Sequence, residues 1–303
     1  MSNARISFVY NSDIRNNGTA TLAYNSVRHQ LGWGDKVDRW RPEGELPEKE
    51  LYIYVDDGRD DLTWECPSPS AYWAVDTHLG YDYRLWKAKQ FDKVYCAQKE
   101  GVAKMRKDGV KEVYWLPLAC NPMAHPNLSE MLVHKNKDDH TWGKGLDKQY
   151  DISFVGFLNE GDGTDASNNR IEWLDHAFKH FPNSWLAWQC FFEDMAVRII
   201  RGRFGFNISI RNDLNMRFFE ILSTGTCLLT NTNVEGIDDL GFEDEQHFVG
   251  YKSKEELVAK AKYYLDNPME REKIAQAGHE KVRTGHTYHK RMQRILDDFE
   301  IAA

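Results

Sequence analysis

Arg217 and Glu220 are the residues of this chain whose types and spacing first suggest binding chemistry. They lie three positions apart in the segment 212–230, NDLNMRFFEILSTGTCLLT, and a helix over 214–223 would place them on one face. A guanidinium group pairs with phosphate oxygens, and a carboxylate accepts hydrogen bonds from hydroxyl groups. The phosphates and ribose of a nucleotide would satisfy both side chains. The alternative is a surface i, i+3 ion pair, which contributes only about 0.2–0.5 kcal/mol.

The elements around this pair must place it at the edge of a sheet. A helix over 214–223 would turn one apolar stripe toward that sheet, formed by Leu214, Phe218, Ile221 and Leu222. Asn212 and Asp213 are good N-cap residues, so the first helical turn would present free backbone N–H groups. These groups would lie at the carboxyl end of a strand over 206–210, where open α/β sheets bind ligands and helix N-termini attract phosphate.

Short apolar runs bounded by turn residues predict buried strands along the whole chain, and helical stretches separate them. The first series of strands covers 6–10, 51–55, 71–75, 93–97 and 113–118, with helices at 19–32 and 98–109. The second series covers 151–157, 184–190, 206–210 and 226–230, with helices at 169–181, 192–203 and 253–267. Alternating strands and helices are typical of parallel, doubly wound sheets. We therefore expect an α/β protein with two Rossmann-like domains.

The polar stretch between the two series predicts a domain boundary. From 121 to 150 the chain carries prolines, glycines and the run HKNKDDH, without sustained periodicity. We expect a Rossmann-like domain over 1–120, a linker or excursion over 121–150 and a second Rossmann-like domain over 151–285. The remaining residues, 286–303, are helical in pattern and predict a C-terminal helix.

Composition restricts the class of protein. The 303 residues are 41% hydrophobic and 13% aromatic, too apolar for a disordered chain, and no apolar run approaches the ~18 residues of a membrane span. A net charge of −8 gives no general attraction to nucleic acid, although Arg198, Arg201 and Arg203 form a local basic patch. The five cysteines form no CxxC pair, which argues against disulfides and structural zinc. The N-terminus lacks a signal-peptide pattern, so we expect a cytoplasmic protein.

Three further polar segments follow predicted strands. Asp76 and His78, in DTH after the strand AYWAV, could supply a general base for a hydroxyl group, or could be a helix cap and a surface histidine. VDDGRDD at 55–61 has the oxygen ligands of a divalent metal site, but we interpret it as a solvated loop and predict no metal. The loop 154–170 lacks the G-x-G-x-x-G spacing of NAD-binding proteins, whereas Gly156 in it would allow close approach of a phosphate or sugar.

From about Asp151 to Arg294 the chain resembles the C-terminal half of the CgeB-like (spore maturation, YkvP-type) glycosyltransferases, which have the GT-B fold. The residues that carry this resemblance are YDISFVG, DLNMRFFEILSTGTCLLTN, YKSKEELVAKAKYYLDNPMEREKIAQAGHEKV and HTYHKR. PSAYWAVDTH and VYWLPLACNP extend it more loosely into the first half. The resemblance implies two facing Rossmann-like domains, with a nucleotide-sugar bound mainly by the second, and a final helix that crosses back to the first.

The resemblance also implies roles for individual residues. Glu220, followed five residues on by Gly225, matches the glutamate that holds the ribose, and Asn212 stands where many relatives carry another glutamate. Arg217, with a second arginine, would stabilise the leaving diphosphate, so no divalent metal or other cofactor is expected. The sugar-donor site is expected to comprise Glu220, Arg217, Asn215, Asn212, Gly156, Arg203 and Arg170.

The expected activity is hexosyltransferase-like transfer from a nucleoside diphosphate sugar to a hydroxyl on a glycan, protein, small molecule or modified nucleic acid. His78 and Asp76 are the expected catalytic residues on the acceptor side. Trp64, Tyr72 and Trp73 could form a sugar-stacking face, although most aromatic residues of the chain are expected to lie in the core. One alternative, motivated by Asn212, is a non-catalytic coat or assembly protein that binds sugar nucleotides or glycans. Another is a DNA-modifying transferase acting on a hydroxymethylated base, which would require a basic groove.

Overall fold

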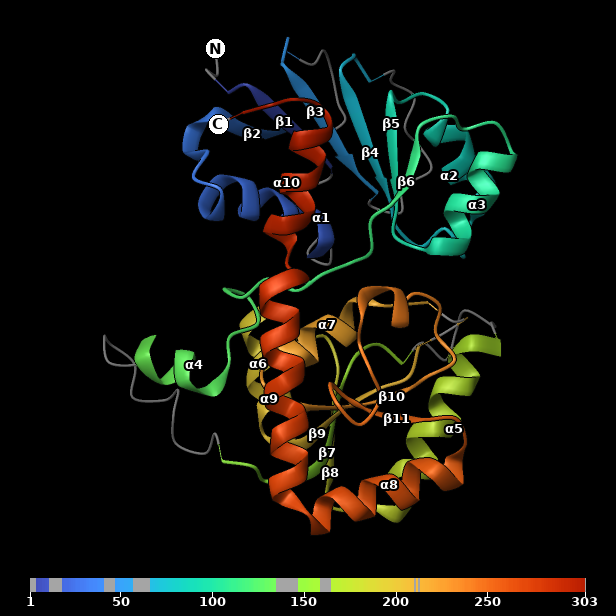
Figure 1. Cartoon of the computed structure of the whole chain (residues 1–303), viewed down its shortest axis with the longest axis vertical. Helices are drawn as coiled ribbons and strands as arrows, with labels where there is room; N and C mark the ends of the chain where they lie inside the picture. Colours follow the sequence, from blue (N-terminus) through green and yellow to red (C-terminus); the bar gives the residue numbers. More distant parts are fainter. Residues whose placement is uncertain are drawn as a thin grey trace. The chain divides into compact units, whose positions relative to one another are not determined.

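The computed structural model describes residues 4–10, 18–40, 47–56, 66–134, 147–158, 165–209, 211 and 213–302. The chain divides into two compact units. The first unit is Met1–Leu118 with Tyr288–Ala303, and the second is Ala119–Thr287. Each unit is built around one parallel sheet (Figure 1). The last helix therefore belongs to the first unit, although it ends the chain.

The first unit has, in the described part of the chain, a six-stranded parallel sheet with the order β2-β1-β3-β4-β5-β6. Its strands are β1 (Ile6–Val9), β2 (Val37–Trp40), β3 (Leu51–Val55), β4 (Ser70–Ala74), β5 (Lys93–Cys96) and β6 (Val113–Trp115). All except β2 lie where apolar runs predict strands. The edge strand β2, VDRW, escaped prediction because a strand at the border of a sheet is only partly buried and tolerates polar residues.

Neighbouring aromatic residues of β4 point to opposite faces of this sheet, because side chains alternate along a strand. Tyr72 stacks on Phe91 at 5.2 Å between ring centres, on the face covered by α2 (Tyr81–Ala88) and α3 (Lys99–Lys107). Trp73 packs against Tyr288 of α10 (Tyr288–Asp298), which lies beside α1 (Gly18–Asn25). Tyr72 and Trp73 both have 0% exposure, so the prediction that they form a sugar-stacking face is wrong. Trp64 lies outside the described residues.

The second unit has a five-stranded parallel sheet with the order β11-β10-β9-β7-β8 among its described residues. Its strands are β7 (Tyr150–Val155), β8 (Ser184–Ala187), β9 (Gly202–Asn207), β10 (Cys227–Asn231) and β11 (Val249–Tyr251). The central strand β9 begins before the predicted range 206–210, because its glycines mark close packing and not a turn. A Cβ atom on Gly205 would lie 2.5 Å from Cγ2 of Ile221, so the helix above this strand requires glycine there.

Helices cover both faces of the second sheet. The described helices of this unit are α4 (Leu128–His134), α5 (Asp165–His180), α6 (Phe192–Ile200), α7 (Met216–Ser223), α8 (Lys254–Asp266) and α9 (Pro268–Gly285). Helices α5 and α8 pack together over Phe204 and Phe206, while Ile199 of α6 and Ile221 of α7 lie over Gly205 on the other face. Helix α4 falls inside the stretch predicted as a linker. Within the residues that the structure describes, none of the helices has the length and apolar character needed to cross a bilayer.

Candidate active site

Arg217 connects the start of α7 to the carboxyl ends of two strands. Its Nε donates a hydrogen bond to the carbonyl oxygen of Val155, the last residue of β7, at 2.7 Å. Its Nη1 lies 3.4 Å from Oδ1 of Asn207, the last residue of β9. Its guanidinium carbon lies 4.8 Å from the ring centre of Phe154. The side chain is thus fixed at the carboxyl edge of the sheet, where open α/β folds bind ligands.

Asn215 caps the N-terminus of α7. Its side-chain oxygen accepts a hydrogen bond from the backbone N–H of Phe218 at 3.2 Å, and its Nδ2 donates to Oδ1 of Asn207 at 3.1 Å. The prediction that Asn212 and Asp213 cap this helix is wrong. Three neighbouring Asn and Asp residues are all good caps, and the bond to Asn207 favours the last of them. The position of Asn212 itself lies outside the described residues.

Gly156 follows β7 and lies directly against Arg217. A Cβ atom at this position would overlap Nη2 of Arg217 and would lie 3.1 Å from Cζ of Phe154. The backbone N–H of Gly156 donates to the carbonyl oxygen of Ala187 at 3.1 Å, which continues the pairing of β7 with β8. Gly156 therefore leaves the space that the Arg217 guanidinium occupies, and both belong to one cluster.

Arg170 brings a second positive charge to this edge. Its Nη1 donates to the carbonyl oxygen of Phe157 at 3.0 Å, in the segment after β7. Burial and, to a smaller extent, the nearby charge of Arg170 lower the pKa of Arg217 to about 9, while Glu220 opposes the shift. Two neighbouring guanidinium groups repel each other, so an anion between them would be stabilising. Together with the N-terminus of α7, they form an arrangement suited to phosphate oxygens.

Arg203 stands apart from this cluster. It is the second residue of β9, and its Nη1 lies 3.0 Å from Oδ1 of Asp151 near the start of β7. Because β7 and β9 are parallel, their amino ends lie at the edge away from Val155 and Asn207. The structure therefore separates Arg203 from the other predicted sugar-donor residues.

Glu220 lies inside the second unit, with 5% of the residue exposed. Burial raises the pKa of its carboxyl group to about 7, and the charge of Arg217 opposes the shift. Its Oε1 lies 3.3 Å from Nε2 of His125, which is also buried. The alternative of an exposed surface pair with Arg217 is therefore excluded. His125 was not predicted as a site residue, since nothing in ACNPMAHP relates it to position 220.

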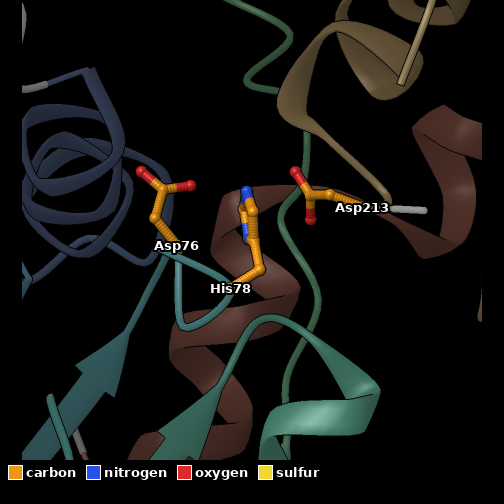
Figure 2. A group of neighbouring side chains, drawn as sticks. All are labelled: Asp76, His78 and Asp213. Carbon is orange, nitrogen blue, oxygen red and sulfur yellow. The ribbon is translucent and has the colours of Figure 1, made fainter. Parts of the chain in front are cut away.

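Asp76 and His78 follow β4, and both side chains extend from the loop at its carboxyl end (Figure 2). Thr77 between them donates from its N–H and from Oγ1 to Oε1 of Gln98, at 3.0 Å in each case. Asp76 has a φ of +54°, a left-handed conformation that is uncommon outside glycine. The N-cap of α2 is a glycine, so Asp76 is not the cap of that helix. Figure 2 also labels Asp213, which belongs to the second unit and precedes α7.

Arg84 of α2 fastens this loop at both ends. Its Nε donates to the carbonyl oxygen of Val75 at 2.6 Å, and its Nη1 donates to that of Leu79. Its Nε also lies 2.5 Å from Oδ2 of Asp56, a buried carboxylate after β3. Asp56 is the first acid of VDDGRDD and is committed to this ion pair. The rest of that run, 57–61, lies outside the described residues.

Comparisons with known proteins identify relatives of one class. Residues 167–297 match a family described as glycosyl transferase-like. No curated protein matches the chain significantly. Sucrose-phosphate synthase from Thermosynechococcus elongatus is similar with a TM-score of 0.64, 10% identity and 98% of both chains covered. Anabaena HepE in complex with UDP and glucose gives 0.65 at 8% identity, covering 98% of this chain and 99% of that one. WaaG, a glycosyltransferase involved in lipopolysaccharide biosynthesis, gives 0.61 at 12% identity, covering 97% and 99%.

These similarities define the class of fold. The chain has the α/β architecture of the GT-B glycosyltransferases, with two Rossmann-like units that each contain a parallel sheet. The predicted fold is thereby confirmed. The segment that matches the glycosyl transferase-like family runs from α5 into α10 and includes Arg170, Arg217 and Glu220.

Proposed function

We propose that this chain is a glycosyltransferase that moves a hexosyl group from a nucleoside diphosphate sugar to a hydroxyl acceptor. The observation that carries the proposal is the pair of guanidinium groups, Arg170 and Arg217, beside the capped start of α7. Phosphate binds where backbone N–H groups and guanidinium groups converge. The diphosphate gains negative charge as the sugar leaves, so the same cations would stabilise the transition state.

UDP-sugars are the first candidates for the sugar donor. HepE, one of the structural neighbours, has been solved with UDP-glucose as well as with UDP and glucose. In this chain Arg217 and Arg170 would hold the diphosphate, and Glu220 would accept hydrogen bonds from the ribose hydroxyls. The guanidinium groups of Arg217 and Arg170 would neutralise the charge of the diphosphate, so we propose that the reaction uses no divalent metal.

His78 is the proposed general base for the acceptor. Its imidazole would take the proton from the acceptor hydroxyl while that oxygen forms a bond to the anomeric carbon and the bond from that carbon to the diphosphate breaks. Asp76, on the same loop, would stabilise the imidazolium that results. The bonds of Thr77 to Gln98 support this assignment, because they fix the backbone that carries both residues.

The wider context is also a proposal. We assign the chain to the CgeB-like branch of GT-B enzymes and to the cytoplasm, where its five free cysteines would stay reduced. The acceptor is a hydroxyl of a glycan, a protein or a small molecule, or of a hydroxymethylated base. A nucleic acid is proposed only as an acceptor. A protein that shows no salt-sensitive binding to DNA would exclude this acceptor.

Thermal-shift measurements with UDP-, GDP-, dTDP- and CMP-sugars identify the nucleotide, because a ligand that binds the native state raises the apparent stability. With that sugar donor, Arg217→Met should lower kcat/KM by about 10²–10³-fold. Arg198→Gln is the matched control, since Arg198 is paired with Asp194 on the surface of α6 and should leave turnover unchanged. Tight binding of a sugar donor without hydrolysis or transfer would instead support the non-catalytic binding role. Failure of every nucleotide to bind would overturn the proposal.

A further inference from the structure

His125 is a fully buried histidine of the second unit, in the segment that leads to α4. Its Nδ1 accepts a hydrogen bond from the backbone N–H of Asn121, at 3.4 Å. A nitrogen that accepts cannot carry the proton of a neutral imidazole, so the proton lies on Nε2. Within the described residues Nε2 has no hydrogen bond that meets strict geometry, and the carboxylate oxygen Oε1 of Glu220 lies 3.3 Å away.

We propose that His125 is a positioning residue, which donates from Nε2 to Glu220, favours the ionised form of that carboxyl group and orients it for the ribose of the sugar donor. The proposal rests on the proposed function, because it gives His125 its role through the carboxylate assigned to the ribose. In the protein without nucleotide, Nε2 of His125 should carry the proton, and that proton should favour ionisation of Glu220.

The segment that carries the imidazole is fastened at several points, as a positioning role requires. Oγ of Ser223, on α7, donates to the carbonyl oxygen of His125 at 2.8 Å. Two residues further on, Nδ2 of Asn127 lies 3.2 Å from Nε2 of His279 on α9. Arg283, also on α9, is bonded to Glu130 of α4. The segment that carries His125 is therefore fastened to the same helix that carries Glu220.

Burial, together with the positive charge of Arg283, keeps His125 neutral. Burial lowers the pKa of its imidazole to about 3, and the positive charge of Arg283 contributes to the shift. Among the described residues, the charged and titratable groups that bear on this pair include Arg217 on α7, Arg283 and His279 on α9 and Glu130 on α4. A neutral N–H donor stabilises a carboxylate without needing a charge of its own. His125 thus acts as a hydrogen-bond donor over the whole pH range in which Glu220 titrates.

Loss of this donor should make Glu220 harder to ionise. A protonated carboxyl group accepts hydrogen bonds less well than a carboxylate, so binding of a ribonucleotide should weaken while binding of the 2′-deoxy analogue changes less. The discrimination between UDP and dUDP is therefore a direct readout of the state of Glu220. A purely structural role of His125 would weaken both nucleotides equally.

The first test uses the wild-type protein without any nucleotide. ¹⁵N NMR of histidine-labelled protein should show His125 as the neutral tautomer protonated at Nε2 from pH 5 to pH 8. Protonation at Nδ1 instead would overturn the proposal. This measurement does not depend on whether the chain is a glycosyltransferase, so its failure is distinguishable from failure of the proposed function.

The second test compares His125→Phe with His125→Gln, because the glutamine amide can place an N–H near the position of Nε2. ¹³C NMR of the Glu220 carboxyl group should show its titration midpoint raised by about one pH unit in the phenylalanine variant, which is a tenfold change in ionisation. The glutamine variant should restore both the midpoint and the preference for UDP over dUDP. An unchanged midpoint in His125→Phe would overturn the proposal. If that variant does not fold, the first test still decides, because protonation of Nδ1 in the wild-type protein would overturn the proposal.

Discussion

The carboxylate of Asp56 and the guanidinium of Arg84 form a buried ion pair in the first unit, with 2.5 Å between Oδ2 and Nε. The same Nε also donates to the carbonyl oxygen of Val75, and Nη1 donates to that of Leu79; these two residues bracket the loop of His78. One side chain thus connects the end of β3, the loop after β4 and helix α2. The Asp56–Arg84 ion pair therefore helps to fix the backbone of His78, the proposed general base. The spacing of these residues in the sequence does not reveal this contact.

Arg84→Met should destabilise the protein and slow the chemical step. It leaves Asp56 as a buried carboxylate without its cation, so the free energy of unfolding should fall by about 3–5 kcal/mol. The loop of His78 loses two hydrogen bonds, and kcat should therefore fall more than the affinity for the sugar donor, which we assign to the second unit. Denaturant unfolding and steady-state kinetics measure the two effects.

A double variant separates these effects. Asp56→Asn combined with Arg84→Met removes the buried charge as well as its partner, so most of the lost stability should return. The hydrogen bonds from Arg84 to the loop remain absent, and kcat should stay low. Recovery of kcat along with stability would show that Arg84 does not hold the catalytic loop.

Gly156→Ala should weaken the binding of the sugar donor with little loss of stability. The added Cβ atom would overlap the guanidinium of Arg217, which must then move away from Val155. We expect the Kd for UDP to rise by about tenfold, the equivalent of 1.4 kcal/mol. Isothermal titration measures it. Gly285→Ala is the matched control, because nothing lies within 4 Å of a Cβ atom there, and an equal effect of both changes would contradict the explanation.

Arg217→Lys tests whether the shape of the guanidinium matters in addition to its charge. Arg217 bonds to Val155 and Asn207 and still has N–H groups for a phosphate, whereas a single ammonium cannot span these partners. We expect kcat/KM to fall by about 10²-fold, close to the effect of removing the charge altogether. Full activity of the lysine variant would mean that only the charge is used.

The fold was predictable because it depends on patterns that the chain repeats many times. Nine of the eleven strands described here overlap the apolar runs that predict strands, and the two exceptions are the short edge strands β2 and β11. The central strand β9 was shifted in the prediction, since Gly202 and Gly205 look like turn residues until the helices above them are known. Packing thus overrides local preference where two elements approach most closely.

Sequence spacing indicated Arg217, Arg170 and Glu220 as candidate residues, and their role in binding the sugar donor stays a prediction, whereas the residues that surround them were not foreseen. Arg217 and Glu220 share one helix, so their spacing relates them directly. His125 lies 95 positions away from Glu220, and only folding of the second unit brings the two together. Arg203 illustrates the opposite case, because it is close in sequence to the other candidates but lies at the amino end of β9, away from the proposed binding edge.

Glu220 and His125 should have opposite effects on how the free energy of unfolding changes with pH. Burial raises the pKa of Glu220 from 4.5 to about 7, so between these values the folded state holds a proton that the unfolded chain has released. The free energy of unfolding therefore falls as pH rises through this window, by about 3 kcal/mol in all. Glu220→Gln removes this loss, and the stability of the variant relative to wild type should increase from pH 4.5 to pH 7.

His125 acts in the other direction, because burial and Arg283 lower its pKa from 6.5 to about 3. As pH falls below 6.5 the unfolded chain takes up a proton that the folded state excludes, so the free energy of unfolding falls toward acid. Between pH 4.5 and 6.5 the two contributions oppose each other in the wild-type protein. His125→Gln should therefore gain stability relative to wild type as pH falls, the mirror image of Glu220→Gln. Denaturant unfolding across this range measures both, and a difference from wild type that does not change with pH would refute the assignment for that residue.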